Sequence, residues 1–196
     1  LEQQVQRMLQ DSRGRRLAIE FGTQWLEVRS FNQFQGKDEE LFPAFNAPLR
    51  DAMYEESIRL FQDLFENDRT IWQLVDADHT FVNDVLANHY GLPGVEGSNF
   101  RRVDRVQEQG RGGILGLGSI LSKHSSASRT SPVLRGNWIA EILLGEHLPL
   151  PPDDVPKLPE ADSSDGLSVR PLVAQHARLP HCAPCPKRIG PLGFAR

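Results

Sequence analysis

Two cysteines near the carboxyl end of the chain are the residues best placed to do chemistry. Cys182 and Cys185 are the only cysteines among 196 residues, and two residues separate them. Thiols at this spacing can share one partner: each other in a disulfide, a metal ion, or the two vinyl groups of a haem. The spacing therefore predicts a paired site and leaves its partner open.

Two of these partners require more than the pair itself. A structural zinc ion needs four ligands, and His176 or His181 would supply only part of the missing half. A thioredoxin-like redox pair belongs after a strand in a βαβ pattern, and no such pattern precedes Cys182. A disulfide, free thiols, half of a metal site completed from elsewhere, and haem attachment remain as the interpretations of the pair.

A second group of polar residues has the types, but not the spacing, of a metal site. It contains two acids and two histidines, and no known ligand pattern matches their separation. Helix-capping acids and solvent-facing histidines are the favoured interpretation. The residues are Asp76, Asp78, His79 and His89.

Two further stretches resemble a nucleotide-binding and a catalytic motif, but each lacks features that the motif requires. Gly116–Leu121 starts like a dinucleotide loop, but Leu121 stands where the third glycine belongs and no strand precedes it. Small residues that allow close helix packing explain this stretch better. His124 and Ser125 are neighbours, yet nothing indicates a third group or an oxyanion hole to activate the serine. We find no catalytic constellation, and whether the chain is an enzyme stays open.

Composition and charge are those of an ordinary soluble protein, with 24% charged and 39% hydrophobic residues and a net charge of -4. Residues 166–196 hold five Arg or Lys and no acid, so the cysteines lie in a basic tail. Such a tail is either simply solvated or suited to an anionic partner such as haem propionates. No apolar stretch is long enough for a membrane span, and no nucleic-acid-binding pattern is found. The start at Leu1, without Met or a signal-like stretch, suggests a piece of a longer protein.

The elements that must position these residues are predicted to be helices. Apolar residues recur at three and four along most of the chain, and no stretch alternates strongly enough to demand a strand. Asn46 is a candidate N-cap for the longest helix, and Gly91 suits a left-handed helix end. Helices are expected over 1–9, 15–28, 47–66, about 79–90, 134–144 and 167–179.

The predicted fold class is all-α, an irregular helical domain followed by a proline-rich linker and a small cysteine-containing helical tail. The helical domain spans 1–148, with a division into subdomains 1–91 and 92–148 as a further option. Five prolines between Pro149 and Pro159 favour an extended linker over 149–165. The tail, 166–196, is expected to be a truncated domain.

Three runs of residues together resemble a known set of neighbouring domains. They are Phe42–Gly91 with its Leu49–Ser57 and Leu74–Asn83 segments; Arg111–Leu115 followed by Arg129–Ile139 and Leu143–Gly145; and Cys182–Cys185 followed by Ile189–Phe194. In this order the runs resemble the C-terminal domains of unknown function of large planctomycete cytochrome-c-associated proteins.

The resemblance implies a c-type haem at the tail, because the family usually reads Cys-x-x-Cys-His there. The two thiols would attach the haem and the histidine would ligate its iron. This chain has Pro186 at the histidine position, and proline offers no ligand.

The resemblance also implies a function and a location. It suggests an accessory or electron-transfer module with an intact or degenerate haem c site, in the periplasm or cell envelope. Its partners would be other domains of the same protein and a redox partner protein. The alternative is a non-enzymatic helical interaction domain in which Cys182 and Cys185 form a disulfide or stay free.

Overall fold

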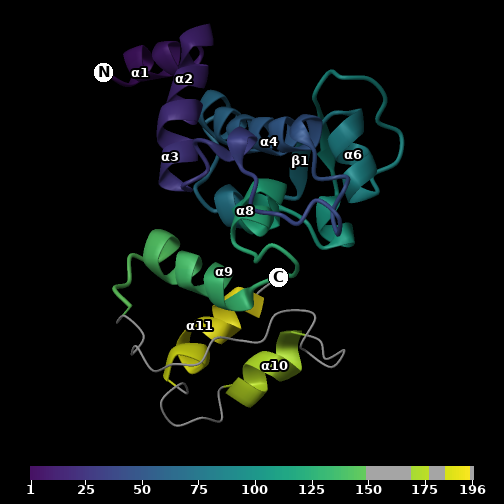
Figure 1. The fold of residues 1–196 in the computed structure, drawn as a ribbon. Coiled ribbons are helices and arrows are strands. Elements are labelled where there is room, and N and C mark those ends of the chain that lie inside the picture. The colour runs from purple at the N-terminus through teal and green to yellow at the C-terminus, as the bar shows by residue number, and fades with distance from the viewer. Residues whose placement is uncertain (149–168, 177–183, 195–196) are drawn as a thin grey trace. The chain divides into compact units, whose positions relative to one another are not determined.

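The computed structural model describes residues 1–148, 169–176 and 184–194. Contacts divide the chain into two compact units: the first is formed by residues 1–35 and 43–123, the second by residues 36–42 and 124–195. Both are built mainly of helices, which confirms the predicted all-α class (Figure 1). The predicted linker, 149–165, lies outside the described residues, and the predicted domain boundaries stay a prediction.

The long helix α4, Ala47–Glu66, is the centre of the first unit. It starts as predicted: the side chain of Asn46 accepts a hydrogen bond from the Leu49 amide at 3.1 Å, and Pro48 lies in the first turn. Its buried positions recur at three and four, which is the spacing of one helix face. They are Leu49, Ala52, Met53, Glu56, Ser57, Ile58, Leu60 and Phe61.

Short helical pieces before α4 cover one side of it. The predicted second helix is shorter than 15–28 and contains a π-helical turn, in which the Thr23 amide donates to the Ala18 carbonyl five residues earlier. Gly22 allows this segment to approach α4, because a Cβ there would strike the ring of Phe61. The pieces are α1 (Glu2–Leu9), η1 (Ser12–Gly14), α2 (Arg15–Leu17), η2 (Ala18–Gly22), α3 (Thr23–Trp25) and η3 (Phe31–Gln33).

A two-stranded sheet corrects the predicted helix over 79–90. Strand β1, His79–Val82, pairs antiparallel with β2, Arg101–Asp104, and the helix α6, Asp84–Tyr90, starts only afterwards. Asn83, rather than Asp76 or Asp78, is its N-cap, accepting from the Leu86 amide at 3.0 Å. The reason is tertiary: pairing with a strand some twenty residues later overrides the helical spacing of the apolar residues.

Two predictions around α6 and the glycine-rich run are confirmed. Gly91 ends α6 in the left-handed region, with φ of 72°. Gly118 opens α8, Gly118–Lys123, and lies so close to Tyr90 and Met53 that a Cβ would strike both side chains. Small residues therefore serve close packing here, as the sequence indicated. The remaining elements of this unit are α5 (Gln73–Asp76), η4 (Val106–Gln109) and α7 (Gly113–Gly116).

The second unit contains the helices of the carboxyl-terminal part. The predicted helix over 134–144 consists of α9, Pro132–Trp138, and the π-helical turn η5, Ile139–Leu143. The side chain of Ser131 caps α9 by accepting from the Leu134 amide at 3.3 Å. The predicted helix over 167–179 is α10, Val169–His176, and the chain continues to α11, Pro184–Phe194.

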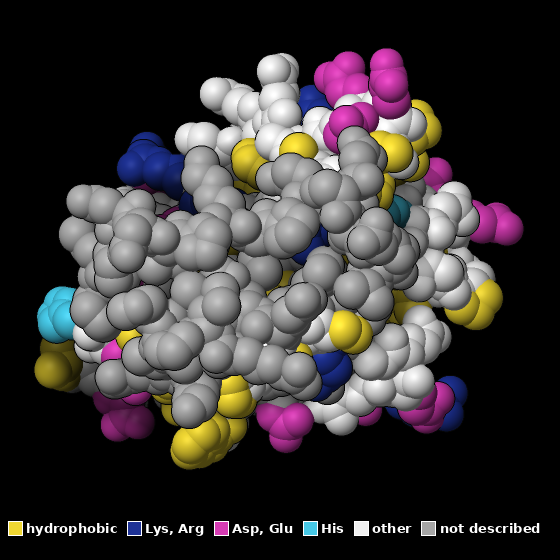
Figure 2. Space-filling view, turned by 60° about the horizontal axis from the view of Figure 1, so that its bottom comes forward, with side chains coloured by type: hydrophobic (Ala, Val, Ile, Leu, Met, Phe, Trp, Pro, Cys, Tyr) yellow, Lys and Arg dark blue, Asp and Glu magenta, His cyan; other side chains and the backbone are white. Residues whose placement is uncertain are grey.

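The described surface is mixed in character. Figure 2 shows hydrophobic side chains at several separate points, interleaved with acidic and basic ones. Ile71, Trp72 and Val75 are among the exposed apolar residues. Among the described residues, no helix combines the length and the apolar character that a membrane crossing requires.

Candidate functional site

The structure describes the predicted cysteine site only in part. Cys182 lies outside the described residues, as does His181. Cys185 is the second residue of α11, so its backbone belongs to the first turn of that helix. The pairing of the two thiols stays a prediction.

The opposite end of α11 is fixed to α9 by unusually close backbone packing. A Cβ at Gly193 would run into the Pro132 carbonyl, and one at Gly136 would run into the Ile189 carbonyl. Ile189 itself is only 4% exposed. Glycine at 136 and 193 is therefore required for the two helices to meet as they do.

One arginine completes this contact. Gly193 lies in the last turn of α11, where helix carbonyls lack a partner within the helix. The Arg135 guanidinium donates to its oxygen from Nε at 2.8 Å and from Nη2 at 2.5 Å. Arg170 of α10 also stacks on the Phe194 ring, 4.2 Å from its centroid. The cysteine-bearing helix is thus anchored at its far end by glycine packing and by charged hydrogen bonds.

The residues next to the cysteines do not fit a histidine-ligated haem. Such a haem needs a donor atom directly after the second cysteine. Pro186 occupies that position within the first turn of α11, and its ring carries no lone pair for iron. The sequence has the Cys-x-x-Cys pair and lacks the histidine that follows it in a c-type haem site.

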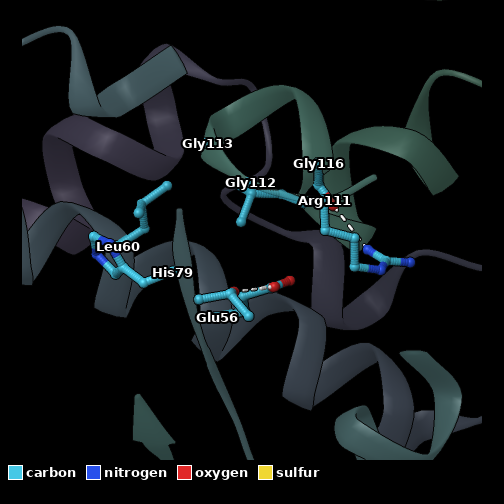
Figure 3. Close-up of a pocket in the computed structure, with 9 residues that line it drawn as sticks. Glu56, Leu60, His79, Arg111, Gly112, Gly113 and Gly116 are labelled. Atoms are coloured by element: carbon cyan, nitrogen blue, oxygen red, sulfur yellow. Dashed lines mark hydrogen bonds between the residues drawn. The ribbon is translucent and has the colours of Figure 1, made fainter. Parts of the chain in front are cut away.

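The most elaborate polar site in the described residues was not predicted from the sequence. Glu56, in the middle of α4, is 2% exposed, and its carboxylate accepts three hydrogen bonds. Thr80 of β1 donates to Oε1 at 2.5 Å, Tyr90 of α6 donates to Oε2 at 2.6 Å, and the Gly118 amide donates to Oε2 at 3.3 Å. One side chain therefore ties together α4, β1, α6 and α8, and Figure 3 shows part of this site.

A cation lies beside this carboxylate. The Arg111 guanidinium stacks on the Tyr90 ring, with Cζ 3.3 Å from the ring centroid. Its Nη1 donates to the Gly116 carbonyl at 2.9 Å, a bond drawn in Figure 3. Arg111 is thereby held in place from both sides and offers a positive charge to the buried acid.

Burial dominates the protonation of the site. Desolvation raises the pKa of Glu56 above its ordinary value, although its three donors and the Arg111 charge act in the opposite direction. Burial and the neighbouring Glu56 charge hold the pKa of Tyr90 well above its usual range. Tyr90 is therefore a neutral donor, and Glu56 takes up a proton at a higher pH than an exposed glutamate does.

The acids and histidines considered as a metal site are spread over different contacts. His79 is 5% exposed, so the expectation of a solvent-facing side chain was wrong there; it contacts Asp63 across 3.1 Å. Burial lowers the pKa of His79, which favours the neutral ring. His89 is exposed as expected. Within the part of the chain that the structure describes, no group of three acids, histidines or cysteines could hold a metal ion.

Asp76 and Asp78 bind the segment after β2 instead of capping a helix. The Gln107 amide donates to Asp78 Oδ1 at 2.9 Å, and the Gln107 side chain donates to Asp76 Oδ1 at 3.0 Å. The expectation that either acid caps the next helix was wrong because strand β1 stands between them and that helix.

The space beside Glu56 limits what this site can do. A small pocket is lined by Glu56, His79, Arg111 and the glycines Gly112, Gly113 and Gly116, and it has room for about one water molecule. An organic substrate does not fit there. The arrangement is suited to holding elements together, and its polar groups already bind one another.

Two family models match the chain. Residues 1–92 match PSD4, described as a protein of unknown function (DUF1592), and residues 111–195 match PSCyt3, described as a protein of unknown function (DUF1588). Each match covers a little less than half of the chain. No curated protein and no solved structure matches it significantly.

The Glu56 site contains residues from both matched segments. Glu56, Thr80 and Tyr90 belong to the DUF1592 match, whereas Arg111 and Gly118 belong to the DUF1588 match. All five residues lie in the first unit. The cysteine-bearing helix and its glycine contacts with α9 belong to the DUF1588 match alone.

Proposed function

We propose that the chain is a non-catalytic accessory module of an extracytoplasmic cytochrome-c-associated protein. In this proposal the tail keeps the paired thiols of a c-type site and carries no histidine-ligated haem. The observation that carries it is Pro186 in the first turn of α11, directly after Cys185. The printed name of the DUF1588 model, PSCyt3, supports the cytochrome association.

The packing of α11 supports a structural role for the tail. Helix α11 is fixed to α9 by the close backbone approach at Gly136 and Gly193 and by the hydrogen bond from Arg135 to the Gly193 carbonyl. Cys185 belongs to the first turn of this helix, and a disulfide with Cys182 is the pairing that we propose. An extracytoplasmic location would permit that bond to form and persist.

The buried carboxylate supports the same proposal from the first unit. Glu56 is enclosed by its own donors and has no room beside it for an organic substrate. A general acid or base must reach a bound substrate within hydrogen-bond distance. Glu56 is better suited to joining four elements of a scaffold whose partners are other domains of the same protein.

The proposal is tested by expressing the wild-type chain and Pro186→His side by side in a host that performs cytochrome c maturation. We expect no Soret absorbance for the wild type and a Soret band for Pro186→His, because the substitution restores the missing ligand. The control is Pro186→His with Cys182→Ala and Cys185→Ala, which should lose covalent haem. A Soret band of equal intensity in the wild type would contradict the proposal.

A further inference from the structure

The division into two units does not follow the division into two domains. Residues 36–42 belong to the DUF1592 match but lie in the second unit with 124–195. Residues 111–123 belong to the DUF1588 match but lie in the first unit. Each domain therefore contributes a segment to the unit that consists mostly of the other.

The segment 111–123 contributes to the buried core of the first unit. The Gly118 amide donates to the Glu56 carboxylate at 3.3 Å and to the Tyr90 hydroxyl at 2.9 Å. Ser119, fully buried, shares a hydrogen bond of 2.7 Å with Ser57 of α4. Without this segment, Glu56 would lose one donor and its neighbouring Arg111 cation, and Ser57 would lose its hydroxyl partner.

The segment Gly36–Phe42, here called the arm, makes the reciprocal contribution to the second unit. The Lys37 ammonium donates to the Ser125 carbonyl at 3.0 Å, to the Ser125 hydroxyl at 2.7 Å and to the Ser126 carbonyl at 2.7 Å. An ammonium group has three N–H donors, and these contacts offer it three oxygen acceptors. The Asp38 amide adds a backbone hydrogen bond to the Ala127 carbonyl at 3.1 Å.

Local hydrogen bonds fix the backbone conformation of both the arm and the loop that it contacts. On the arm, Asp38 Oδ1 accepts from the amides of Glu40 and Leu41 at 2.9 and 3.0 Å, which folds the arm into a tight turn. On the other side, Ser125 pairs with Thr130 in an isolated bridge. The Ser126 hydroxyl donates to the Arg129 carbonyl at 2.9 Å. The loop 124–131, which leads directly into α9, thus presents its carbonyl groups to the arm.

We propose that the two domains are interlocked by a reciprocal exchange of segments, and that the loop 124–131 is the receptor for the Lys37 arm. The DUF1588 domain then depends on the arm for the order of the loop that starts α9, and the DUF1592 domain depends on 111–123 for its buried core. This inference does not rest on the proposed function, since it holds whether or not the tail attaches haem.

Hydrogen exchange on the full chain tests the receptor. Lys37→Met keeps the length of the side chain and removes all three donors. We expect amide exchange in 36–42 and 124–131 to accelerate about tenfold, while exchange in α4 stays unchanged. Glu39→Gln is the matched control, because Glu39 is an exposed neighbour on the same arm and should leave exchange in both segments at the wild-type rate.

A milder variant keeps the test decisive if Lys37→Met accelerates exchange throughout the chain. Ser125→Ala removes only the hydroxyl acceptor and should accelerate exchange in the same two segments about threefold, again without a change in α4. The proposal would be overturned if Ser125→Ala and a folded Lys37→Met both exchanged their amides in 36–42 and 124–131 at the wild-type rate. Faster exchange in only one of the two segments would overturn it as well, because a contact that orders both segments must protect the amides of both.

Discussion

The interior of each unit is stabilised by a different kind of contact. In the first unit a buried, ionisable side chain, Glu56, accepts hydrogen bonds from three other elements. In the second unit the absence of side chains matters most, because Gly136 and Gly193 let two backbones meet. A polar network is sensitive to the loss of a partner, whereas glycine packing is sensitive to the gain of a single methyl group.

The largest effect should come from removing the hub of the first unit. Glu56→Ala leaves the Thr80 and Tyr90 hydroxyls without an acceptor and opens a cavity in the core. We expect it to lower the free energy of unfolding by about 3–4 kcal/mol, measured by urea denaturation followed by circular dichroism. Asp51→Ala on the exposed side of the same helix should stay within about 0.5 kcal/mol of the wild type. Equal losses for the two variants would show that Glu56 is not a hub.

The next effect should come from adding one methyl group in the second unit. Gly136→Ala drives a Cβ into the Ile189 carbonyl, so we expect a loss of about 2–3 kcal/mol in thermal or urea unfolding. Gly190→Ala is the matched control within α11, because no atom of the described residues lies within 4 Å of a Cβ at this position. That variant should be neutral or more stable by about 0.5 kcal/mol, since alanine favours helix. A stabilising Gly136→Ala would contradict the close packing of α9 and α11.

A smaller effect should follow from removing the cation beside Glu56. Arg111→Met loses the stacking on Tyr90 and the hydrogen bond to the Gly116 carbonyl. We expect a loss of about 1 kcal/mol in the free energy of unfolding. Arg16→Met, at an exposed position, should change it by less than about 0.5 kcal/mol. A neutral Arg111→Met would mean that the carboxylate and its three donors suffice.

The smallest effect should appear as a pH dependence confined to the first unit. The pKa of Glu56 is raised in the folded state, so the folded chain holds this proton at pH values where the unfolded chain has released it. The stabilisation linked to the proton is complete below the ordinary glutamate pKa and is lost as the pH rises through the raised one. The wild type should therefore lose stability relative to Glu56→Gln as the pH increases. A difference that is constant with pH would show that the donors and Arg111 balance the effect of burial on the pKa of Glu56. A difference that grows in favour of the wild type would show that they outweigh it.

The sequence predicted elements that depend on local signals and missed those that depend on long-range contacts. Local signals were reliable where they were complete: Asn46 and Pro48 start α4, and Gly91 ends α6. Strand β1 was missed because only its pairing with Arg101–Asp104 distinguishes it from a helix start. Helix α11 was not predicted separately, because prolines at 184, 186 and 191 interrupt any helical pattern and its contacts with α9 are long-range.

The Glu56 site and the cysteine site also differ in how far the sequence could predict them. Glu56 carried a usable signal, since it lies three residues after Met53 and four before Leu60 on the apolar stripe of α4. An acid at such a position is expected to be buried and hydrogen-bonded. Its donors Thr80, Tyr90 and Gly118 could not be assigned without the fold. For the cysteines the reverse holds: the motif is plain in the sequence, while Cys182 lies outside the described residues.

The most direct test of the central claim is the intact mass of the wild-type chain after expression with cytochrome c maturation. If the chain is an accessory module whose tail lacks a histidine-ligated haem, the mass should equal that of the polypeptide, less two hydrogens where Cys182 and Cys185 form a disulfide. A mass increased by one covalently bound haem, with the matching Soret band, would contradict the account.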